Sequence, residues 1–233
     1  RHARFIRSTK NSAQDIAIEF VIDKFNAGTE MMVYAPDHPG LFAKIAGAIA
    51  LSGVSIVDAR ILTLSNGMAL DTFTVQDFDG TVLTAETKLN RIKSRVVAAF
   101  EGRIRLDREL KNVQARRAGR AEALEAPPRV IIDNAASKFF SVIEINGHDR
   151  AGFLFDITKV ISDLALQIGS AHVSTYGERV VDVFYVKDIF GMKVENEAKI
   201  RQIREALSKA IGVPDDFSVL RLKPIAVQST AVE

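Results

Sequence analysis

The stretch Ala-Pro-Asp-His-Pro-Gly-Leu-Phe, residues 35–42, returns in altered form as Gly-His-Asp-Arg-Ala-Gly-Phe-Leu, residues 147–154. Asp37 lies 112 residues before Asp149, and Gly40 lies 112 residues before Gly152. In each copy an apolar run typical of a strand ends at the loop, and an apolar run with helical spacing begins directly after it. The repeated loop therefore predicts two copies of one folding unit.

The aspartate and the glycine of this loop have two interpretations. In the structural one, the aspartate caps the following helix and the glycine only permits the turn. In the binding one, the aspartate holds the ammonium group of a free amino acid, and unpaired N–H groups at the helix start hold its carboxylate. A single loop favours the structural interpretation, whereas duplication of the loop favours binding.

The residues around the first loop predict, from its own strand onward, the order strand, helix, strand, strand, helix. Leu41, Ile45 and Ile49 recur every four residues and indicate the first helix, which ends near Gly53. The β-rich runs at 16–25 and 30–35 flank a turn and predict a hairpin. The remaining predicted elements are a strand at 54–63, a turn at Asn66-Gly67, a strand at 68–77, and a helix with Leu89, Ile92, Val96 and Phe100 on one face.

The second half repeats this order. Its predicted elements are strands at 140–145, 166–175, 180–188 and 218–222, and helices marked by Phe153, Ile157 and Ile161 and by Ile200, Ile203, Leu207 and Ile211. In both halves the strand after the first helix changes the phase of its apolar alternation at the same place, after Ile56 and after Ile168. A shared phase change predicts a β-bulge or a change in what each face contacts, and it indicates that the whole unit is duplicated.

Three segments lie outside the repeated pattern. Residues 1–15 are polar and basic, with Phe5 and Ile6 as apolar anchors, and we interpret them as a frayed connector within an N-terminal region, 1–28, that contains a candidate extra strand. Residues 103–128 are a strongly basic insertion of helix-favouring composition, interpreted as a solvated connecting helix, with a partner-binding or nucleic-acid surface as the alternative. We assign the short strand 130–132 after it to the first unit as its fourth strand, and residues 225–233 to a tail.

Composition excludes several classes of protein. The chain has 233 residues, 47% of them hydrophobic, which is enough for two small globular domains. It has no cysteine, which excludes disulfides and thiolate metal sites and fits a cytoplasmic location. Its net charge of +2 gives no general attraction for nucleic acid, and no apolar run is long enough to span a bilayer.

No catalytic constellation is recognisable in the chain. The four histidines show no HExxH spacing, so no metal site is predicted, and neither a Gly-x-Ser-x-Gly motif nor a Walker phosphate loop is present. Asp71 and Asp182 occupy matching strand positions. We interpret them as residues that maintain the fold or an interface, not as a catalytic pair.

Each half resembles the ACT domain, a small-molecule sensing module of amino-acid metabolism that carries Asp-x-x-Gly between its first strand and first helix. The resemblance covers residues 29–133 and 138–224. It implies an α+β fold of two ferredoxin-like βαββαβ domains, each an antiparallel sheet with its helices on one face. The ligand-binding residues that it implies are Asp37, His38, Gly40 and Leu41 in the first loop and Asp149, Arg150, Ala151, Gly152 and Phe153 in the second.

The common form of this loop is Asp-Arg-Pro-Gly, and each copy departs from it once. The first copy has His38 in place of the arginine and so lacks a cation, whereas the second has Ala151 in place of the proline and so is less rigid. The resemblance therefore does not decide which loop binds better.

The tandem arrangement, the basic insertion and the segment 129–134 resemble the C-terminal regulatory region of the bifunctional uridylyltransferase/uridylyl-removing enzymes, a family that modifies the PII nitrogen-signalling protein. The first four residues, Arg-His-Ala-Arg, resemble the stretch between the hydrolytic HD domain of that family and its first ACT unit. The resemblance implies L-glutamine or another small amino acid as the effector that switches the enzyme from adding UMP to removing it. It also implies two partners, the catalytic domains of the same protein and, through them, PII. Those domains are expected to use a divalent metal, Mg²⁺ or Mn²⁺.

Two other functions stay open on the residues alone. The first is a freestanding tandem ACT module that binds an effector or dimerises, from which only the non-Met start and the Arg-His-Ala-Arg stretch distinguish this chain. The second is a nucleic-acid-binding ferredoxin-like domain, against which Phe73 and Phe184 lie in strands that contain aspartate and lack the base-stacking motif. A homodimer formed through sheet edges or helix faces is a further hypothesis. No membrane partner is expected.

Overall fold

Eight strands form one sheet in the computed structural model, which describes residues 2–9, 15–23, 28–77, 79–117, 128–176 and 179–213. The strand order is β1-β2-β4-β3-β7-β8-β6-β5, and every neighbouring pair is antiparallel. The strands are β1 (Ala17–Asp23), β2 (Gly28–Pro36), β3 (Val54–Arg60), β4 (Met68–Asp77), β5 (Arg129–Asp133), β6 (Ser141–His148), β7 (Gln167–Tyr176) and β8 (Arg179–Lys187). The helices are α1 (His2–Thr9), α2 (Leu41–Leu51), α3 (Glu86–Phe100), α4 (Leu106–Arg117), α5 (Phe153–Asp163) and α6 (Glu197–Ala210).

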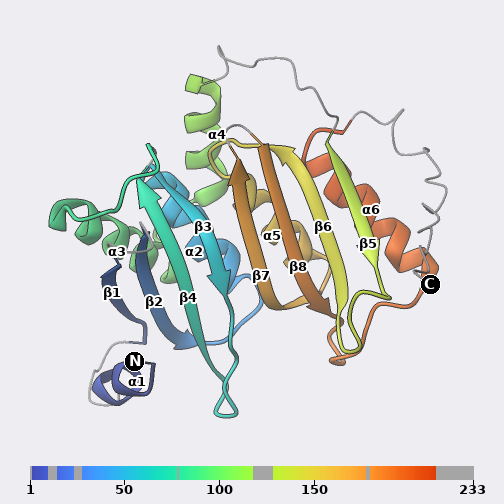
Figure 1. Cartoon of the computed structure of the whole chain (residues 1–233), viewed down its shortest axis with the longest axis horizontal. Coiled ribbons are helices and arrows are strands. Elements are labelled where there is room, and N and C mark those ends of the chain that lie inside the picture. The colour runs from blue at the N-terminus through green and yellow to red at the C-terminus, as the bar shows by residue number, and fades with distance from the viewer. Residues whose placement is uncertain are drawn as a thin grey trace, which may run out of the picture.

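The sheet consists of two units in mirrored strand order. The first unit runs from β1 to α3 and the second from β5 to α6, and β3 of the first pairs with β7 of the second at Ala59 and Ala171. The helices α2, α3, α5 and α6 cover one face of this sheet (Figure 1). The α+β fold with antiparallel strands and helices on one face is therefore confirmed. The two expected sheets, however, are joined edge to edge.

The predicted phase change is a β-bulge in both units. The register of β3 against β4 shifts between Ile56 and Asp58, and that of β7 against β8 shifts between Ile168 and Ser170. One extra residue on a strand reverses the direction of the following side chains, which is the sequence signal seen at these two places.

The assignment of strand 130–132 to the first unit is wrong. β5 pairs with β6 of the second unit, over the register Arg129 to Asn146 through Asp133 to Val142. The place beside β2, where a fourth strand of the first unit would lie, is already taken by β1. Each unit therefore begins with its edge strand, and its described elements run in the order ββαββα instead of βαββαβ. The predicted closing strand at 218–222 lies outside the described residues.

The N-terminal segment is more ordered than expected. Residues 2–9 form the helix α1, and Phe5 is 4% exposed because it packs on Met32 and Leu70. The neighbouring strand residues Met31 and Phe73 point into the core under the helices, so Met32 and Leu70 lie on the opposite face of the sheet. The prediction of a frayed connector is thus wrong for residues 2–9, although Phe5 is confirmed as an anchor.

One apolar core lies between the sheet and the four covering helices. It includes Ile45, Phe73 and Ile92 of the first unit and Ile157 and Phe184 of the second, each no more than 1% exposed. Because a single core spans both units, they share one folded body. Within the described residues, no helix combines the length and the apolar character needed to cross a membrane.

Candidate functional site

Both Asp-x-x-Gly loops turn directly into a helix through a left-handed glycine. Gly40 has φ 82° and Gly152 has φ 80°, and each is the N-cap residue of its helix without any side-chain cap. A side chain with a Cβ is strained at such angles, so the glycine is needed for the turn. The Asp37 carboxylate does not cap α2. Its Oδ2 instead accepts a hydrogen bond of 2.7 Å from Oγ1 of Thr63.

The first turn of α2 leaves backbone donors unused. The N–H of Leu41 donates to the carbonyl of His38, and that of Lys44 donates to Gly40. The N–H groups of Phe42 and Ala43 between them donate to no acceptor among the described residues. Unpaired N–H groups at a helix start, together with the helix dipole, favour the binding of an anion such as a carboxylate.

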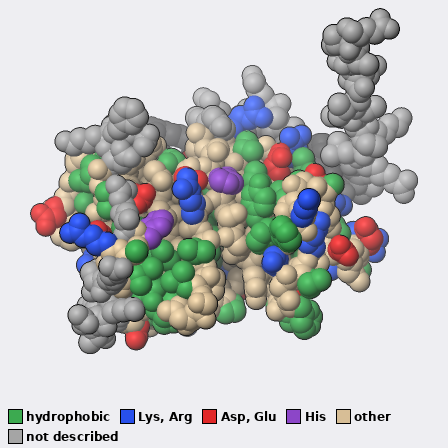
Figure 2. Space-filling view, turned by 60° about the horizontal axis from the view of Figure 1, so that its bottom comes forward, with side chains coloured by type: hydrophobic (Ala, Val, Ile, Leu, Met, Phe, Trp, Pro, Cys, Tyr) green, Lys and Arg blue, Asp and Glu red, His purple; other side chains and the backbone are tan. Residues whose placement is uncertain are grey.

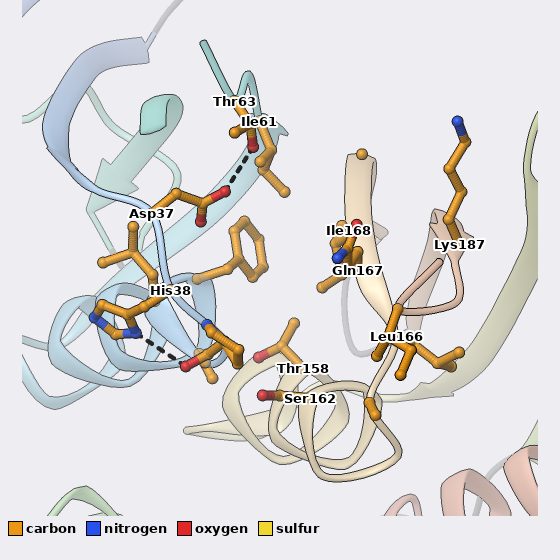
Figure 3. Close-up of a pocket in the computed structure, with 18 of the residues that line it drawn as sticks. Asp37, His38, Ile61, Thr63, Thr158, Ser162, Leu166, Gln167, Ile168 and Lys187 are labelled. Carbon is orange, nitrogen blue, oxygen red and sulfur yellow. Dashed lines mark hydrogen bonds between the residues drawn. The ribbon is translucent and has the colours of Figure 1, made fainter. Parts of the chain in front are cut away.

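The first loop opens into a cleft between the two units. The cleft has a volume of about 560 Å³ and is lined on one side by the loop residues 37–43 with Ile61 and Thr63, and on the other by α5 and the start of β7. Figure 3 shows Asp37 and Thr63 on the first unit facing Thr158, Ser162 and Gln167 on the second. The cleft therefore exists only because the two units are joined.

The cleft contains charges of both signs. Asp37 and Asp71 of the first unit are its carboxyl groups, and Lys187 at the end of β8 contributes an ammonium group. Nζ of Lys187 lies 4.7 Å from the centre of the Phe140 ring, which also lines the cleft, so a cation–π contact holds the lysine there. The ammonium end of a zwitterion finds carboxyl groups in this lining, whereas the ammonium group of Lys187 lies against the Phe140 ring.

Asp71 is the most buried charged group of the cleft. The pKa of Asp71 is raised to about 7, mainly by burial and also by the nearby charge of Asp37, while a hydrogen bond from the backbone of Leu62 opposes the rise. His38, by contrast, is turned to its own unit. Its Nδ1 lies 2.9 Å from the carbonyl oxygen of Pro39, and its ring centre lies 5.9 Å from that of Phe100.

The second loop is covered by the helix α4. A Cβ placed on Gly152 would lie 3.2 Å from the methyl groups of Leu110, which is 1% exposed. Gln114, one turn further along α4, donates a hydrogen bond of 2.9 Å from Nε2 to the carbonyl of Ala151. The helical part of the basic insertion is therefore a cover over the second loop, not only a connection between the units.

The arginine of the second loop is engaged in contacts with its own unit. Arg150 pairs with Asp156 of α5 at 2.5 Å, donates to the carbonyl of Ala210 at the end of α6 at 3.0 Å, and lies over the ring of Phe153. These contacts join the loop to α5 and α6. The arginine therefore fixes the loop in place and leaves little of its charge for a ligand.

The structure separates the residues predicted to bind a ligand into two groups. Asp37, His38, Gly40 and Leu41 line the cleft, whereas residues 149–153 do not. Of these, Ala151 and Gly152 lie under α4, and Arg150 pairs with Asp156 of its own unit. Sequence reasoning missed the residues that the second unit contributes, such as Ser162, Gln167 and Lys187, because nothing in the sequence indicates which surfaces meet across the units. The sequence shows that Asp71 recurs as Asp182 in the second unit, but it does not indicate that Asp71 lies at a ligand site.

The two units match the fold, the loop and the repeat of a known domain. Residues 136–212, most of the second unit, match the family described as "ACR family N-terminal ACT domain", and the first unit has the same strands, helices and left-handed loop glycine. The chain has the fold of a pair of ACT domains. The two ACT domains share one sheet, but the first loop opens into the cleft whereas α4 covers the second loop.

Several curated proteins resemble this ACT pair over almost its whole length. The bifunctional uridylyltransferase/uridylyl-removing enzyme of Rhodospirillum rubrum is 51% identical over 211 residues, which are 91% of this chain and 22% of that enzyme. The enzymes of the same description from Azospirillum brasilense and Gluconobacter oxydans are each 45% identical, over 92% and 89% of this chain and 23% and 22% of their own lengths. The chain thus spans less than a quarter of these relatives.

Solved structures show more distant likenesses. An aspartate kinase from Synechocystis is 14% identical with a TM-score of 0.39, and 80% of this chain and 27% of that one are covered. A putative glycine cleavage system transcriptional repressor is 10% identical with a TM-score of 0.27, covering 78% of this chain and 91% of that one. These values are too low to say anything of the activity of this chain.

Proposed function

We propose that this pair of ACT domains is the amino-acid-sensing region of a uridylyltransferase/uridylyl-removing enzyme, and that L-glutamine binds in the cleft at the first loop. One observation carries the proposal: Asp37, Phe42 and Ala43 line a cleft whose opposite wall belongs to the other unit, and the N–H groups of Phe42 and Ala43 have no acceptor among the described residues. Sequence identity of 51% to such an enzyme over 91% of the chain supports the assignment of the parent protein.

Each part of a free amino acid has a partner of suitable chemistry in this cleft. The ammonium group pairs with the carboxylate of Asp37, and the α-carboxylate accepts the N–H groups at the start of α2, where the helix dipole adds to the attraction. The side-chain amide of glutamine both donates and accepts hydrogen bonds, and the opposite wall offers it the polar side chains of Ser162 and Gln167.

A ligand in this position contacts both units and so stabilises one arrangement of them. Such a bias can be transmitted to attached catalytic domains, because a ligand shifts an equilibrium by its difference in affinity for the two states. In the proposed parent enzyme, L-glutamine would in this way favour the removal of UMP from PII over its attachment.

Calorimetric titration of L-glutamine into the whole 233-residue chain tests the proposal, with Asp37→Ala and Asp149→Ala as a matched pair of variants. We expect saturable binding that Asp37→Ala abolishes and that Asp149→Ala leaves in place, because the second loop is covered by α4. A folded chain that takes up no L-glutamine contradicts the proposed ligand. Binding that survives Asp37→Ala but not Asp149→Ala shows that the proposal assigns the wrong loop.

The face of the molecule drawn in Figure 2 does not favour the alternative of a nucleic-acid-binding domain. On the face shown in Figure 2, Lys and Arg side chains are interspersed with Asp and Glu side chains and do not gather into one basic area. A phosphate backbone requires a concentrated basic surface. We therefore do not propose nucleic acid as a ligand of that face.

A further inference from the structure

One carboxyl group in the lining of the cleft has an oxygen without a partner. Asp71 of β4 is 2% exposed, and its Oδ1 has no hydrogen-bond partner among the described residues. The backbone of Leu62 donates a hydrogen bond to this carboxyl group. A buried polar atom without a partner destabilises the fold, and at the edge of a cleft a ligand can supply the missing donor.

The position of Asp71 points to a cationic ligand group. Asp37 is near enough for its charge to act on Asp71, and both residues line the same cleft. Two carboxyl groups facing one space repel each other when both are ionised, and a cation between them removes the repulsion. An ammonium group has three donors, so it can serve Asp37 and Asp71 at once.

We propose that Asp71 is the second carboxylate that holds the ammonium group of the ligand, which lies between Asp37 and Oδ1 of Asp71. This inference rests on the proposed function and extends it, because it adds a residue and selects ligands with a primary ammonium group. In the proposed complex, the ammonium group donates a hydrogen bond to Oδ1 of Asp71, which has no donor among the described residues of the free protein.

Binding by this route is accompanied by the release of a proton. Since burial raises the pKa of Asp71 to about 7, the group is largely protonated at pH 6 in the free protein. An ammonium group offers only donors, so Asp71 must ionise to accept from it, and its proton passes to the buffer. Affinity should therefore fall as the pH decreases below about 7.

The other charged groups near Asp71 do not replace it in this role. The neighbouring elements carry His38 in the loop, Lys44 on α2, and Glu30, Asp58 and Arg60 on β2 and β3, while Lys187 lies across the cleft. Of these charged groups and Asp37, Asp37 is the one whose charge raises the pKa of Asp71. Because His38 also lines the cleft, it is the loss of proton release in the variant Asp71→Asn that assigns the released proton to Asp71.

The second unit supplies a matched control. Asp182 occupies the corresponding strand position and is 1% exposed, and neither of its carboxyl oxygens has a hydrogen-bond partner of good geometry within the described part of the chain. Burial and the charge of Asp149 likewise raise the pKa of Asp182 to about 7. Asp182 does not line the cleft, so it shares the burial of Asp71 without the proposed contact.

The test is calorimetric titration of L-glutamine at pH 6, in two buffers of different ionisation enthalpy, into the unchanged chain and the variants Asp71→Asn and Asp182→Asn. The unchanged chain and Asp182→Asn are expected to release close to one proton on binding. Asp71→Asn is expected to release none and to bind about tenfold to a hundredfold more weakly, as for the loss of a charge-assisted hydrogen bond. Circular dichroism verifies that both variants are folded.

Two outcomes overturn the inference by different routes. If Asp71→Asn keeps the affinity and proton release of the unchanged chain, Asp71 does not hold the ammonium group, although the glutamine proposal stands. If the unchanged chain binds no L-glutamine, both proposals fail.

A second measurement needs no variant and decides the question even if Asp71→Asn does not fold. Glutaric acid monoamide, which is L-glutamine without its ammonium group, should neither bind tightly nor release a proton. Binding of this analogue with the same proton release would contradict the inference.

Discussion

Ala59 of β3 and Ala171 of β7 lie opposite each other where the two ACT units join, and they are the same residue of the repeat, 112 positions apart. Both are fully buried. Equivalent residues that meet in an antiparallel pair relate the two units by a local twofold axis through this point. The internal duplication thus forms the kind of interface that two identical chains would form.

The small size of Ala59 is needed at this junction. Replacing Ala59 with Leu inserts a larger side chain into a packed core, and we expect the free energy of unfolding to fall by about 1–3 kcal/mol. Urea denaturation of the whole chain measures the loss, and Arg60→Leu is the control because Arg60 is exposed on the same strand. An equal effect of the two substitutions would show that the junction is not tightly packed.

The two loop glycines should differ in their tolerance of a side chain. Gly40→Ala should cost about 1–2 kcal/mol of stability, because the residue keeps φ 82° and its Cβ meets only Oγ of Ser162, at 3.5 Å. Gly152→Ala has the same backbone strain and in addition presses on the buried Leu110. Urea denaturation should therefore rank Gly152→Ala as the more damaging, and the reverse order would contradict the packing of α4 on the second loop.

Leu110 should hold α4 over the second loop. Leu110→Ala removes a buried side chain and should lower the free energy of unfolding by about 2–5 kcal/mol. It should also speed the hydrogen exchange of the backbone amides in residues 151–153, because their cover loosens. Glu109→Ala, on the exposed side of the same helix, should change neither quantity. Unchanged exchange in Leu110→Ala would mean that α4 does not protect this loop.

The buried carboxyl group of Asp182 should make stability depend on pH. Because the pKa of Asp182 is about 7 in the folded chain and near 3.8 when unfolded, the folded state binds the proton more tightly. Stability from this group is fully present below pH 4 and is lost as the pH rises through 7. Asp182→Asn should therefore be about 1–4 kcal/mol more stable than the unchanged chain at pH 8, and close to it at pH 4. Urea denaturation at both values decides, and an unchanged pH profile would contradict the assignment.

The elements of the fold could be predicted because their signals are local. The four-residue spacing from Leu41 gives α2, and the repeated phase changes after Ile56 and Ile168 give two bulges at the places where the structure has them. The partner of β5 could not be predicted in the same way. A strand can pair only with a sheet edge that no other strand occupies. β1 occupies the edge beside β2, and β5 pairs with β6.

The candidate site was predictable on one wall only. The loop motif indicated Asp37 and Gly40, but the wall formed by Ser162 and Gln167 depends on how two surfaces fit together, which a single sequence does not record. The cover over the second loop left a faint signal, since Leu106, Leu110 and Gln114 recur every four residues along one side of α4. In a basic segment this spacing indicates only that one side is buried.

The joint between the ACT units has a mechanical consequence. The two halves of the sheet are joined through a single register pair, Ala59 and Ala171, whereas β1 and β2 or β7 and β8 are joined along most of their length. We therefore expect the sheet to bend most easily along this joint. Under the proposed function, a small molecule that spans the cleft beside this joint would resist the bending, so that the concentration of a metabolite would be converted into an angle between two halves of one protein.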